Sequence, residues 1–345
     1  MLWLLGLSVY PRKMERKRAL QPEGAHHPVV LGATETSCRV GANNERLLTD
    51  LTSACAAYPE LVVILNVFDS PFPGDLRSLN CGKQTPSTAV PWCVKKVTHI
   101  PGMKTAFWRY GISPEVIARV APHSEIVWLF DNDMRVGAAD FDLRDAVASL
   151  LAAQVSAAQP RVQLESGHKR RSLPFRELMA RKQASGEDWP STSASIPLKP
   201  SGCRAQSVPW LEVQTPLIRR DAYESLHTKV LNVLDAHVFN HTVWGVSHIW
   251  CAMFARELPW RKGCAVLDTV INTNTDQFST IEKTHKDAVR RANGRVGCER
   301  IAKRFPSLWP YASKTCGRIK ANKTEFKQTR GILARGECLL RSASE

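Results

Sequence analysis

The chain has 345 residues, of which 43% are hydrophobic and 23% charged, and its formal net charge is +15. This composition is typical of a globular protein with a sizeable core, and it excludes a disordered or collagen-like chain. The stretch Met1–Tyr10 is apolar but too short to span a bilayer, and basic residues follow it, whereas a signal peptide carries them in front. Residues 1–27 are therefore either the stub of a truncated membrane anchor, through which the protein would associate with a membrane, or a fortuitous N-terminus.

The positive charge gathers at the C-terminus. Residues 286–345 contain fifteen Lys and Arg against five Asp and Glu, so this segment carries two thirds of the excess. Such a segment can bind an acidic partner, or it can be a solvated basic surface. Because no nucleic-acid motif accompanies it, we expect no specific nucleic-acid partner and interpret residues 286–345 as a basic extension.

Ten cysteines are spread along the chain, and none forms a Cys-x-x-Cys pair, which argues against a structural zinc site. An even number favours disulfides, with Cys81–Cys93 and Cys298–Cys316 as the closest loop-closing pairs. Asn240 and Asn322 begin glycosylation sequons. These features predict the secretory pathway, in the Golgi or ER lumen, as the location in preference to the cytoplasm.

From Pro28 onward, apolar runs and helical periodicities alternate. Strands are expected at residues 29–31, 61–68, 126–130, 156–159, 211–214 and 265–267. Helices are expected after Asn43 or Asn44 up to Tyr58, at 114–120, from Asp140 or Asp142 to about 153, at 220–235 and at 244–256. Residues 161–207 are basic and then rich in Ser, Pro and Gly, which predicts an inserted loop. The alternation predicts an α/β fold with a mainly parallel sheet and helices on both faces.

The segment with the clearest chemistry is the apolar run Ile126–Phe130, which leads directly into Asp131-Asn132-Asp133. A buried strand that ends in two carboxylates places oxygen ligands at the carboxyl edge of the sheet, where open α/β folds bind their ligands. Mg²⁺ and Mn²⁺ use few protein carboxylates and complete their shells with water and phosphate oxygens. Asp131 and Asp133 are therefore predicted to hold a metal for a phosphorylated substrate; the alternative is a polar turn after a strand.

Five segments in this order resemble a family of predicted glycosyltransferases known as domain of unknown function 707. They are Gly102-Met103-Lys104-Thr105-Ala106-Phe107-Trp108, Val127–Asp133, Ser156-Ala157-Ala158-Gln159-Pro160, Glu212–Tyr223 and Trp244-Gly245-Val246-Ser247-His248-Ile249-Trp250-Cys251. The resemblance covers roughly residues 28–285. It implies a GT-A-like, Rossmann-related domain that transfers a sugar from a nucleotide-sugar donor to a glycan, protein or small-molecule acceptor, with Mn²⁺ or Mg²⁺ as cofactor.

The resemblance also assigns roles to single residues. Asp131 and Asp133 would hold the metal and, through it, the diphosphate, and Lys104 would contact a phosphate; alternatively Lys104 is a solvated lysine. Glu212 would be the general base for the acceptor hydroxyl, or a structural acid paired with Arg219 or Arg220. Trp244 would shape the acceptor side, or belong to the core.

Two positions depart from the family pattern. Ser247 stands where the family carries an aspartate, so that His248 or Glu212 would have to replace that carboxylate. Asn272 lies in the segment where the family places a histidine near the metal, and Asn272 or Asp268 would then supply an oxygen ligand.

These departures keep two other functions open. One is a non-catalytic protein of the same fold that binds a nucleotide or a carbohydrate. The other is a haloacid-dehalogenase-type phosphatase, which also ends an apolar strand in Asp-x-Asp, with Asp131 as nucleophile and Asp133 as acid and base. That family has Thr or Val two residues after the second Asp, where this chain has Arg135.

Overall fold

The computed structural model describes residues 27–37, 41–69, 78–79, 88–164, 203–208, 210–241, 244–275, 288–309 and 337–341. The strands are β1 (Val29–Thr36), β2 (Leu61–Val67), β3 (Ser78–Leu79), β4 (Thr88–Ala89), β5 (Val94–Thr98), β6 (Ser124–Phe130), β7 (Val155–Leu164), β8 (Cys203–Val208), β9 (Leu217–Arg219), β10 (Lys262–Asn274) and β11 (Cys338–Arg341). The helices are α1 (Gly41–Ala57), α2 (Lys104–Tyr110), α3 (Pro114–Val120), α4 (Leu143–Ala152), α6 (Arg220–Lys229), the 3₁₀ turn η1 (Leu231–Val233), α7 (Ala236–His241), α8 (Trp244–Glu257) and α10 (Ala288–Arg304).

Nine of these strands form one sheet in the order β11-β8-β10-β7-β9-β6-β1-β2-β5. Strands β1, β2, β5 and β6 pair in parallel, as do β7 and β10, whereas β9 runs antiparallel to both β6 and β7. Only β8 and β9 oppose the common direction, since β8 is antiparallel to β10 and to β11. The predicted α/β fold with a mainly parallel sheet is confirmed.

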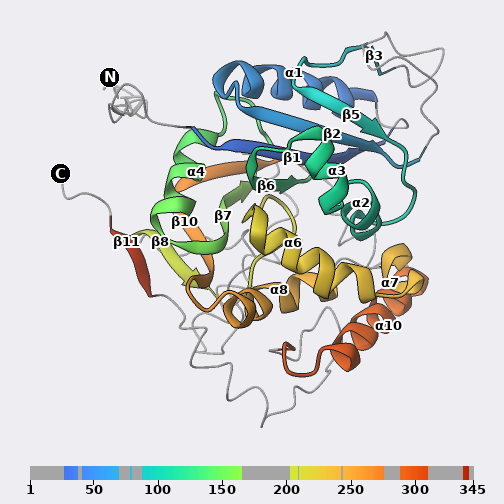
Figure 1. Ribbon diagram of the computed structural model, residues 1–345. Coiled ribbons are helices and arrows are strands. Elements are labelled where there is room, and N and C mark those ends of the chain that lie inside the picture. Colours follow the sequence, from blue (N-terminus) through green and yellow to red (C-terminus); the bar gives the residue numbers. More distant parts are fainter. Residues whose placement is uncertain are drawn as a thin grey trace, which may run out of the picture.

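Helices cover both faces of the sheet (Figure 1), as the alternation of elements predicts. One hydrophobic core lies between the sheet and helices α2, α3, α6 and α8, and residues of α7 and α10 extend it outward. The second core lies on the opposite face under α1 and α4. Two-sided coverage explains why the central strand β6 is apolar without interruption: Ile126–Phe130 alternate between the two cores.

Several elements are longer than the apolar runs that predict them. Strand β1 continues past Gly32 to Thr36, and β7 continues through Pro160, which was expected to end it. On β7, strand β9 pairs only with Ala157 and Ala158, so Pro160 has no β9 partner and its missing N–H interrupts no bond between these two strands. The short elements β5 and α2 were not predicted, because each is too short for a clear periodicity.

The interpretation of residues 161–207 as one loop is corrected at both ends. Strand β7 runs to Leu164, and β8 already begins at Cys203; residues 165–202 lie outside the described part of the chain. The strand expected at 211–214 is also wrong, because this segment is irregular and the regular strand β9 begins at Leu217. Strand β11, from the basic C-terminal segment, joins the main sheet beside β8.

Three disulfides connect described residues: Cys55–Cys93, Cys203–Cys338 and Cys251–Cys264. The expected Cys81–Cys93 pair is wrong, since Cys93 bonds to Cys55 on α1. Sequence proximity suggested the pairing with Cys81, but packing of α1 against the parallel strands decides it. Cys298 is disulfide-bonded as well, and its expected partner, Cys316, lies outside the described residues.

The Cys251–Cys264 disulfide joins α8 to β10 inside the core, with a Cα–Cα distance of 5.4 Å. Replacing both cysteines with alanine is expected to lower the free energy of unfolding by about 2–4 kcal/mol, because the cross-link restricts the unfolded chain. Urea unfolding measures this change. The comparison is the double variant that removes the Cys203–Cys338 disulfide, which joins β8 to β11. A loss of under about 0.5 kcal/mol for Cys251 and Cys264 would contradict the prediction.

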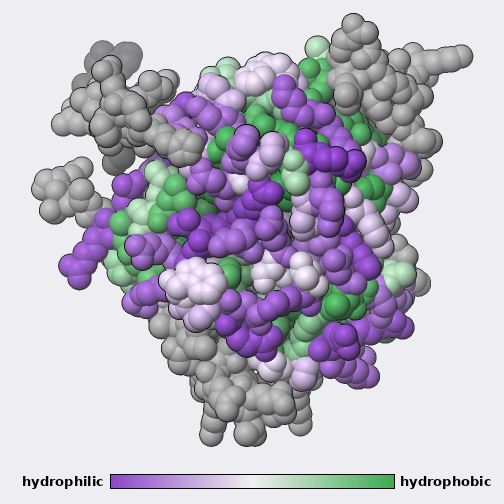
Figure 2. All heavy atoms as spheres, viewed as in Figure 1, coloured by the Kyte–Doolittle hydropathy of each residue, from purple (hydrophilic) through white to green (hydrophobic). Residues whose placement is uncertain are grey.

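The face of the molecule in Figure 2 is mostly hydrophilic, with hydrophobic areas scattered between the hydrophilic residues. In the described part of the chain, no helix combines the length and the apolar character that a membrane crossing requires.

Candidate functional site

The strand order reverses between β1 and β6. From β1 the chain moves outward to β2 and β5, whereas β6 returns to the other side of β1. Counted along the chain, these four parallel strands have the spatial order 3-2-1-4, as in Rossmann-type sheets. The crevice outside the carboxyl ends at such a switch point is where open α/β sheets bind their ligands. In this chain it lies between Glu35, near the end of β1, and Asp131, directly after β6.

Glu35 is fixed at this edge by the neighbouring strand. The Asn66 side chain, which is fully buried on β2, donates a hydrogen bond of 2.8 Å from Nδ2 to Glu35 Oε1. Asn66 is itself held, because its Oδ1 accepts a 2.8 Å hydrogen bond from the backbone N–H of Ile100. Burial raises the pKa of Glu35 to about 7, even though the hydrogen bond from Asn66 and the charge of Lys104 act in the opposite direction.

Lys104 supplies the positive charge of the site. It is the first residue of α2, and it follows a turn at Gly102, whose φ of 114° favours glycine. The ammonium group of Lys104 forms an ion pair with the Asp131 carboxylate. Burial alone would lower the pKa of Lys104, but the charge and hydrogen bond of Asp131, followed by Asp133 and Glu35, raise it above its usual value. Lys104 is therefore not the solvated lysine of the alternative interpretation.

The Asp131-Asn132-Asp133 turn is fixed on its other side by two elements. Arg46 of α1 donates a 2.6 Å hydrogen bond from Nη2 to the carbonyl of Asn132, and its Nη1 donates to the hydroxyl of Thr275. Thr275, just after β10, donates from its backbone N–H (2.7 Å) and from its hydroxyl (2.9 Å) to the carbonyl of Asp133. The backbone that carries both aspartates is thus held by α1 and by the end of β10.

Glu212 comes close to this turn through the irregular segment before β9. The backbone N–H of Asp131 donates a 2.8 Å hydrogen bond to the carbonyl of Gln214, which places residues 212–214 beside the end of β6. Burial raises the pKa of Glu212 to about 7; the charge of Asp131 adds to this effect, and Lys104 opposes it. The structural alternative is not supported, because Arg219 donates to the carbonyls of Val155 and Leu151 and Arg220 pairs with Glu224.

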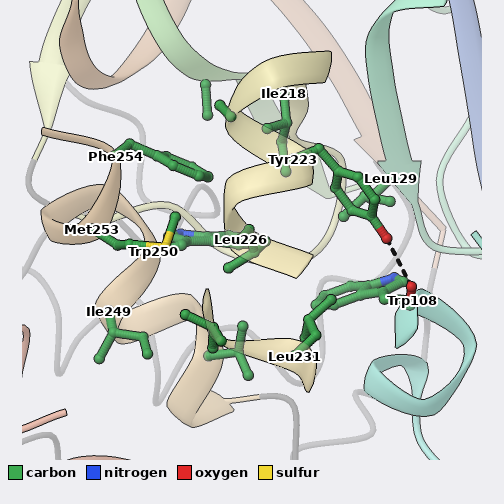
Figure 3. Packing of buried hydrophobic residues seen from close by; sticks show 14 of the residues in the cluster. Trp108, Leu129, Ile218, Tyr223, Leu226, Leu231, Ile249, Trp250, Met253 and Phe254 are labelled. Carbon is green, nitrogen blue, oxygen red and sulfur yellow. Dashed lines mark hydrogen bonds between the residues drawn. The ribbon is translucent and has the colours of Figure 1, made fainter. Parts of the chain in front are cut away.

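A cavity of about 70 Å³ opens beside Glu35, Lys104 and Asp131. Its polar wall contains Glu35, Lys104 and Asp131, and its apolar wall contains Phe107, Trp108, Leu129 and Val213, among others. The apolar wall is part of the larger core. Figure 3 shows Trp108 of α2 beside Tyr223 of α6, whose hydroxyl donates a 2.8 Å hydrogen bond to the carbonyl of Trp108. Trp108 also stacks on Trp250 at 6.2 Å. The polar groups of the cavity are therefore attached to well-packed elements.

The residues at this edge fit a metal only if the substrate completes the coordination. Among the residues that the structure describes, no three His, Cys, Asp or Glu side chains form a cluster that could hold a metal ion. Mg²⁺ and Mn²⁺ do not require such a cage, because one or two carboxylates plus substrate phosphates suffice. If such a shared site forms here, Asp131 and Asp133, fixed at a switch point beside Lys104, would be its hard oxygen donors.

Ser247 and His248 lie in a different environment from Asp131. Both are buried near the start of α8, and the His248 ring stacks on Trp309 and contacts Trp210, with ring centroids 5.4 Å apart in each case. His248 therefore contacts the chain two residues before Glu212, the general-base candidate. The side chain of Trp244 lies outside the described part of the chain, and its predicted role is not tested.

Asn272 is fully buried and donates a 3.3 Å hydrogen bond to the Thr215 hydroxyl, which also accepts one from the indole of Trp128. These hydrogen bonds place the Asn272 side chain among the packed residues beside β6. Asp268 accepts a hydrogen bond from Gln206. Thr275, three residues after Asn272, is hydrogen-bonded to the carbonyl of Asp133.

Sequence reasoning missed Glu35, Arg46 and Thr275. Glu35 had a detectable signal, because Val29–Thr36 could be continued as one strand through Gly32 and would then end in a carboxylate. Arg46 and Thr275 had none, since each acts through backbone carbonyls of a segment that is distant in the sequence.

The fold and site define an α/β protein of Rossmann-related topology with an acidic switch-point site and one central lysine. No protein-family model matches the chain, and no curated protein matches it. The resemblance to the family known as domain of unknown function 707 therefore stays a prediction.

Comparison with solved structures gives distant likenesses. One is to a mycobacterial protein, with 11% identity and a TM-score of 0.39 over 80% of this chain and 74% of that one. Another is to a mannosyltransferase, PcManGT from Pyrobaculum calidifontis, solved in complex with GDP-Man and Mn²⁺. Its identity is 14% and its TM-score 0.36, over 93% of this chain and 85% of that one. At this distance, neither likeness carries a property over to this chain.

Proposed function

We propose that this protein is a metal-dependent glycosyltransferase that moves a sugar from a nucleotide-sugar donor to an acceptor hydroxyl. The observation that carries the proposal is the placement of Asp131 and Asp133, with Lys104, at the carboxyl edge of the switch point between β1 and β6. Nucleotides bind at this position in Rossmann-type sheets, and the residues present suit a diphosphate bound through a divalent cation.

In this proposal each residue has one task. Asp131 and Asp133 hold the cation, which when bound acts as a Lewis acid toward the leaving diphosphate. Lys104 donates to the phosphate oxygens and offsets the negative charge that develops as the bond between the sugar and the diphosphate breaks. Glu212 accepts the proton of the acceptor hydroxyl as its oxygen bonds to the sugar, and a pKa of about 7 suits this role at neutral pH.

The test is a panel of nucleotide sugars, with binding and donor cleavage measured in parallel in the presence and absence of Mn²⁺. We expect Mn²⁺-dependent binding of at least one donor and release of its nucleoside diphosphate. Metal-dependent binding without release would identify a non-catalytic nucleotide-binding protein. Phosphate release from simple monoesters, without nucleotide-sugar binding, would instead identify the phosphatase.

The disulfides between described residues require an oxidising compartment to form and persist. They support, as part of the same proposal, a location in the secretory pathway, where glycan and protein acceptors meet nucleotide sugars. Non-reducing and reducing electrophoresis of the protein isolated from its native cells would show different mobilities if the disulfides form there.

A further inference from the structure

One lysine faces several carboxylates in the candidate site. The ammonium group of Lys104 is paired with Asp131, and the charges of Asp133 and Glu35 also act on it. Lys104 in turn acts on Glu212. In the absence of substrate, Lys104 therefore occupies the electrostatic position at Asp131 that a bound cation would take, and it is the counter-ion of the first aspartate of the pair.

A lysine and a divalent cation cannot share one carboxylate without mutual repulsion, because both positive charges would lie within a few ångströms of it. We infer that Lys104 holds Asp131 as a counter-ion until a diphosphate arrives, and that Lys104 then moves to the phosphate oxygens and leaves Asp131 to the divalent cation. This inference rests on the proposed function. Its consequence is that metal and nucleotide bind together, and that each binds poorly alone.

The local structure allows this exchange without a movement of the backbone. Helix α2 is anchored by Phe107 and Trp108, which are almost completely buried, whereas the side chains of Lys104 and Asp131 are 26% and 16% exposed. An ion pair that is partly open to water is weak compared with a fully buried one, so a diphosphate can compete for the lysine. The lysine stem has four rotatable carbons, and both partners line the same cavity.

A fixed structural ion pair predicts a different response to mutation. If Lys104 only stabilised the turn, its removal would leave the charge of the Asp131 carboxylate uncompensated and would weaken the binding of every ligand. If Lys104 is an exchangeable counter-ion, its removal frees Asp131 for the metal and at the same time removes a phosphate contact. The two cases therefore predict opposite changes in the affinity for the metal measured without a diphosphate. The affinity falls if Lys104 only stabilises the turn, and it rises if Lys104 is an exchangeable counter-ion.

The experiment measures binding of Mn²⁺ alone, and then of GDP and UDP with and without Mn²⁺, by titration calorimetry and by the paramagnetic signal of unbound Mn²⁺. The proteins are wild type, Lys104→Met, Lys104→Gln and Lys104→Arg, with Lys303→Met on the exposed side of α10 as the matched control. Circular dichroism and thermal unfolding check that each variant is folded. If Lys104→Met does not fold, Lys104→Gln replaces it in the comparison.

In wild type we expect the diphosphate to tighten Mn²⁺ binding by about 5- to 150-fold, the usual range of coupling between sites. In Lys104→Met and Lys104→Gln, Mn²⁺ alone should bind about tenfold more tightly, while the diphosphate binds more weakly and the coupling falls towards one. Lys104→Arg should keep the wild-type pattern, because the charge remains.

Two failures are distinguishable. If wild type binds neither diphosphate in the presence of Mn²⁺, the proposed function is overturned and this inference with it. If wild type shows the coupling but Lys104→Met and Lys104→Gln bind Mn²⁺ alone no more tightly than wild type does, the counter-ion exchange is overturned and the proposed function stands.

Discussion

Replacing Asp133 with alanine is expected to weaken Mn²⁺-dependent binding of a nucleoside diphosphate by about 100-fold or more and to abolish donor cleavage. Asp133 is the second carboxylate of the proposed site, and among the described residues no third carboxylate, His or Cys completes a metal cluster, so little remains to hold a cation once Asp133 is removed. Titration calorimetry with GDP and UDP, each with Mn²⁺, measures the binding, and chromatography of the released diphosphate measures the cleavage.

The fold is expected to survive this substitution. The hydrogen bonds that fix the turn from Thr275 reach the backbone carbonyl of Asp133, which alanine keeps. Asp140→Ala is the matched control, because this carboxylate is exposed and lies in the next turn of the chain. Wild-type binding in Asp133→Ala, or an equal loss in Asp140→Ala, would exclude Asp133 as a metal ligand.

The second large effect is expected for Glu212→Gln, which should lower the rate of sugar transfer by about 10²- to 10⁴-fold, the usual contribution of a general base. In wild type, the rate should rise with pH through about 7, where Glu212 loses its proton, and the variant should lack this rise. Rates across a pH series with a fixed donor and acceptor give both results. A variant that keeps the wild-type rate and pH profile would show that another group accepts the proton.

The same substitution should make the protein more stable at alkaline pH. Because burial raises the pKa of Glu212 from 4.5 to about 7, the folded state binds more protons than the unfolded state between these values. Stability from this group is therefore present below pH 4.5 and is lost as the pH rises towards 7. Glutamine has no proton to lose, so Glu212→Gln should exceed wild type at pH 8 by up to about 3 kcal/mol and match it near pH 4.5.

Urea unfolding at several pH values tests this statement. Glu35→Gln should behave in the same way, since burial raises the pKa of Glu35 to about 7 as well. The exposed Glu299 on α10 provides the control, and Glu299→Gln is measured at the same pH values. If Glu212→Gln were less stable than wild type at pH 8, the negative charge of Glu212 would be favourable in the folded protein. Stability at the expense of activity is the pattern expected of a functional carboxylate.

The part of the site that lies on one apolar run was predictable from the sequence. Ile126–Phe130 must be buried on both faces, so the strand ends where the first carboxylate appears, and Asp131 and Asp133 follow at once. The helix after Asp142 was predictable for a similar reason, because a side chain that caps a helix acts within three residues. Both are local effects, and the structure confirms them.

The pairings within the sheet were not predictable in this way. Strand β9 lies between β6 and β7 and runs against both, although only three of its residues form the strand. Cys55 bonds to Cys93 although Cys81 is nearer in the sequence. In each case the partner is chosen by which elements pack together, and hydrophobic burial is not directional enough for a sequence pattern to specify the neighbour.

The sequence by itself therefore determined an α/β chain with helices on both faces of a mainly parallel sheet, and a pair of aspartates at the carboxyl end of a buried strand. It did so because periodicity and burial act over a few residues. Only the tertiary structure decided that Glu35 and Asp131 share a switch point, that Lys104 pairs with Asp131, and that the half-buried Glu212 comes close enough to feel both charges. Parallel strands are joined by long crossovers, so the residues that meet at their carboxyl ends come from distant parts of the chain.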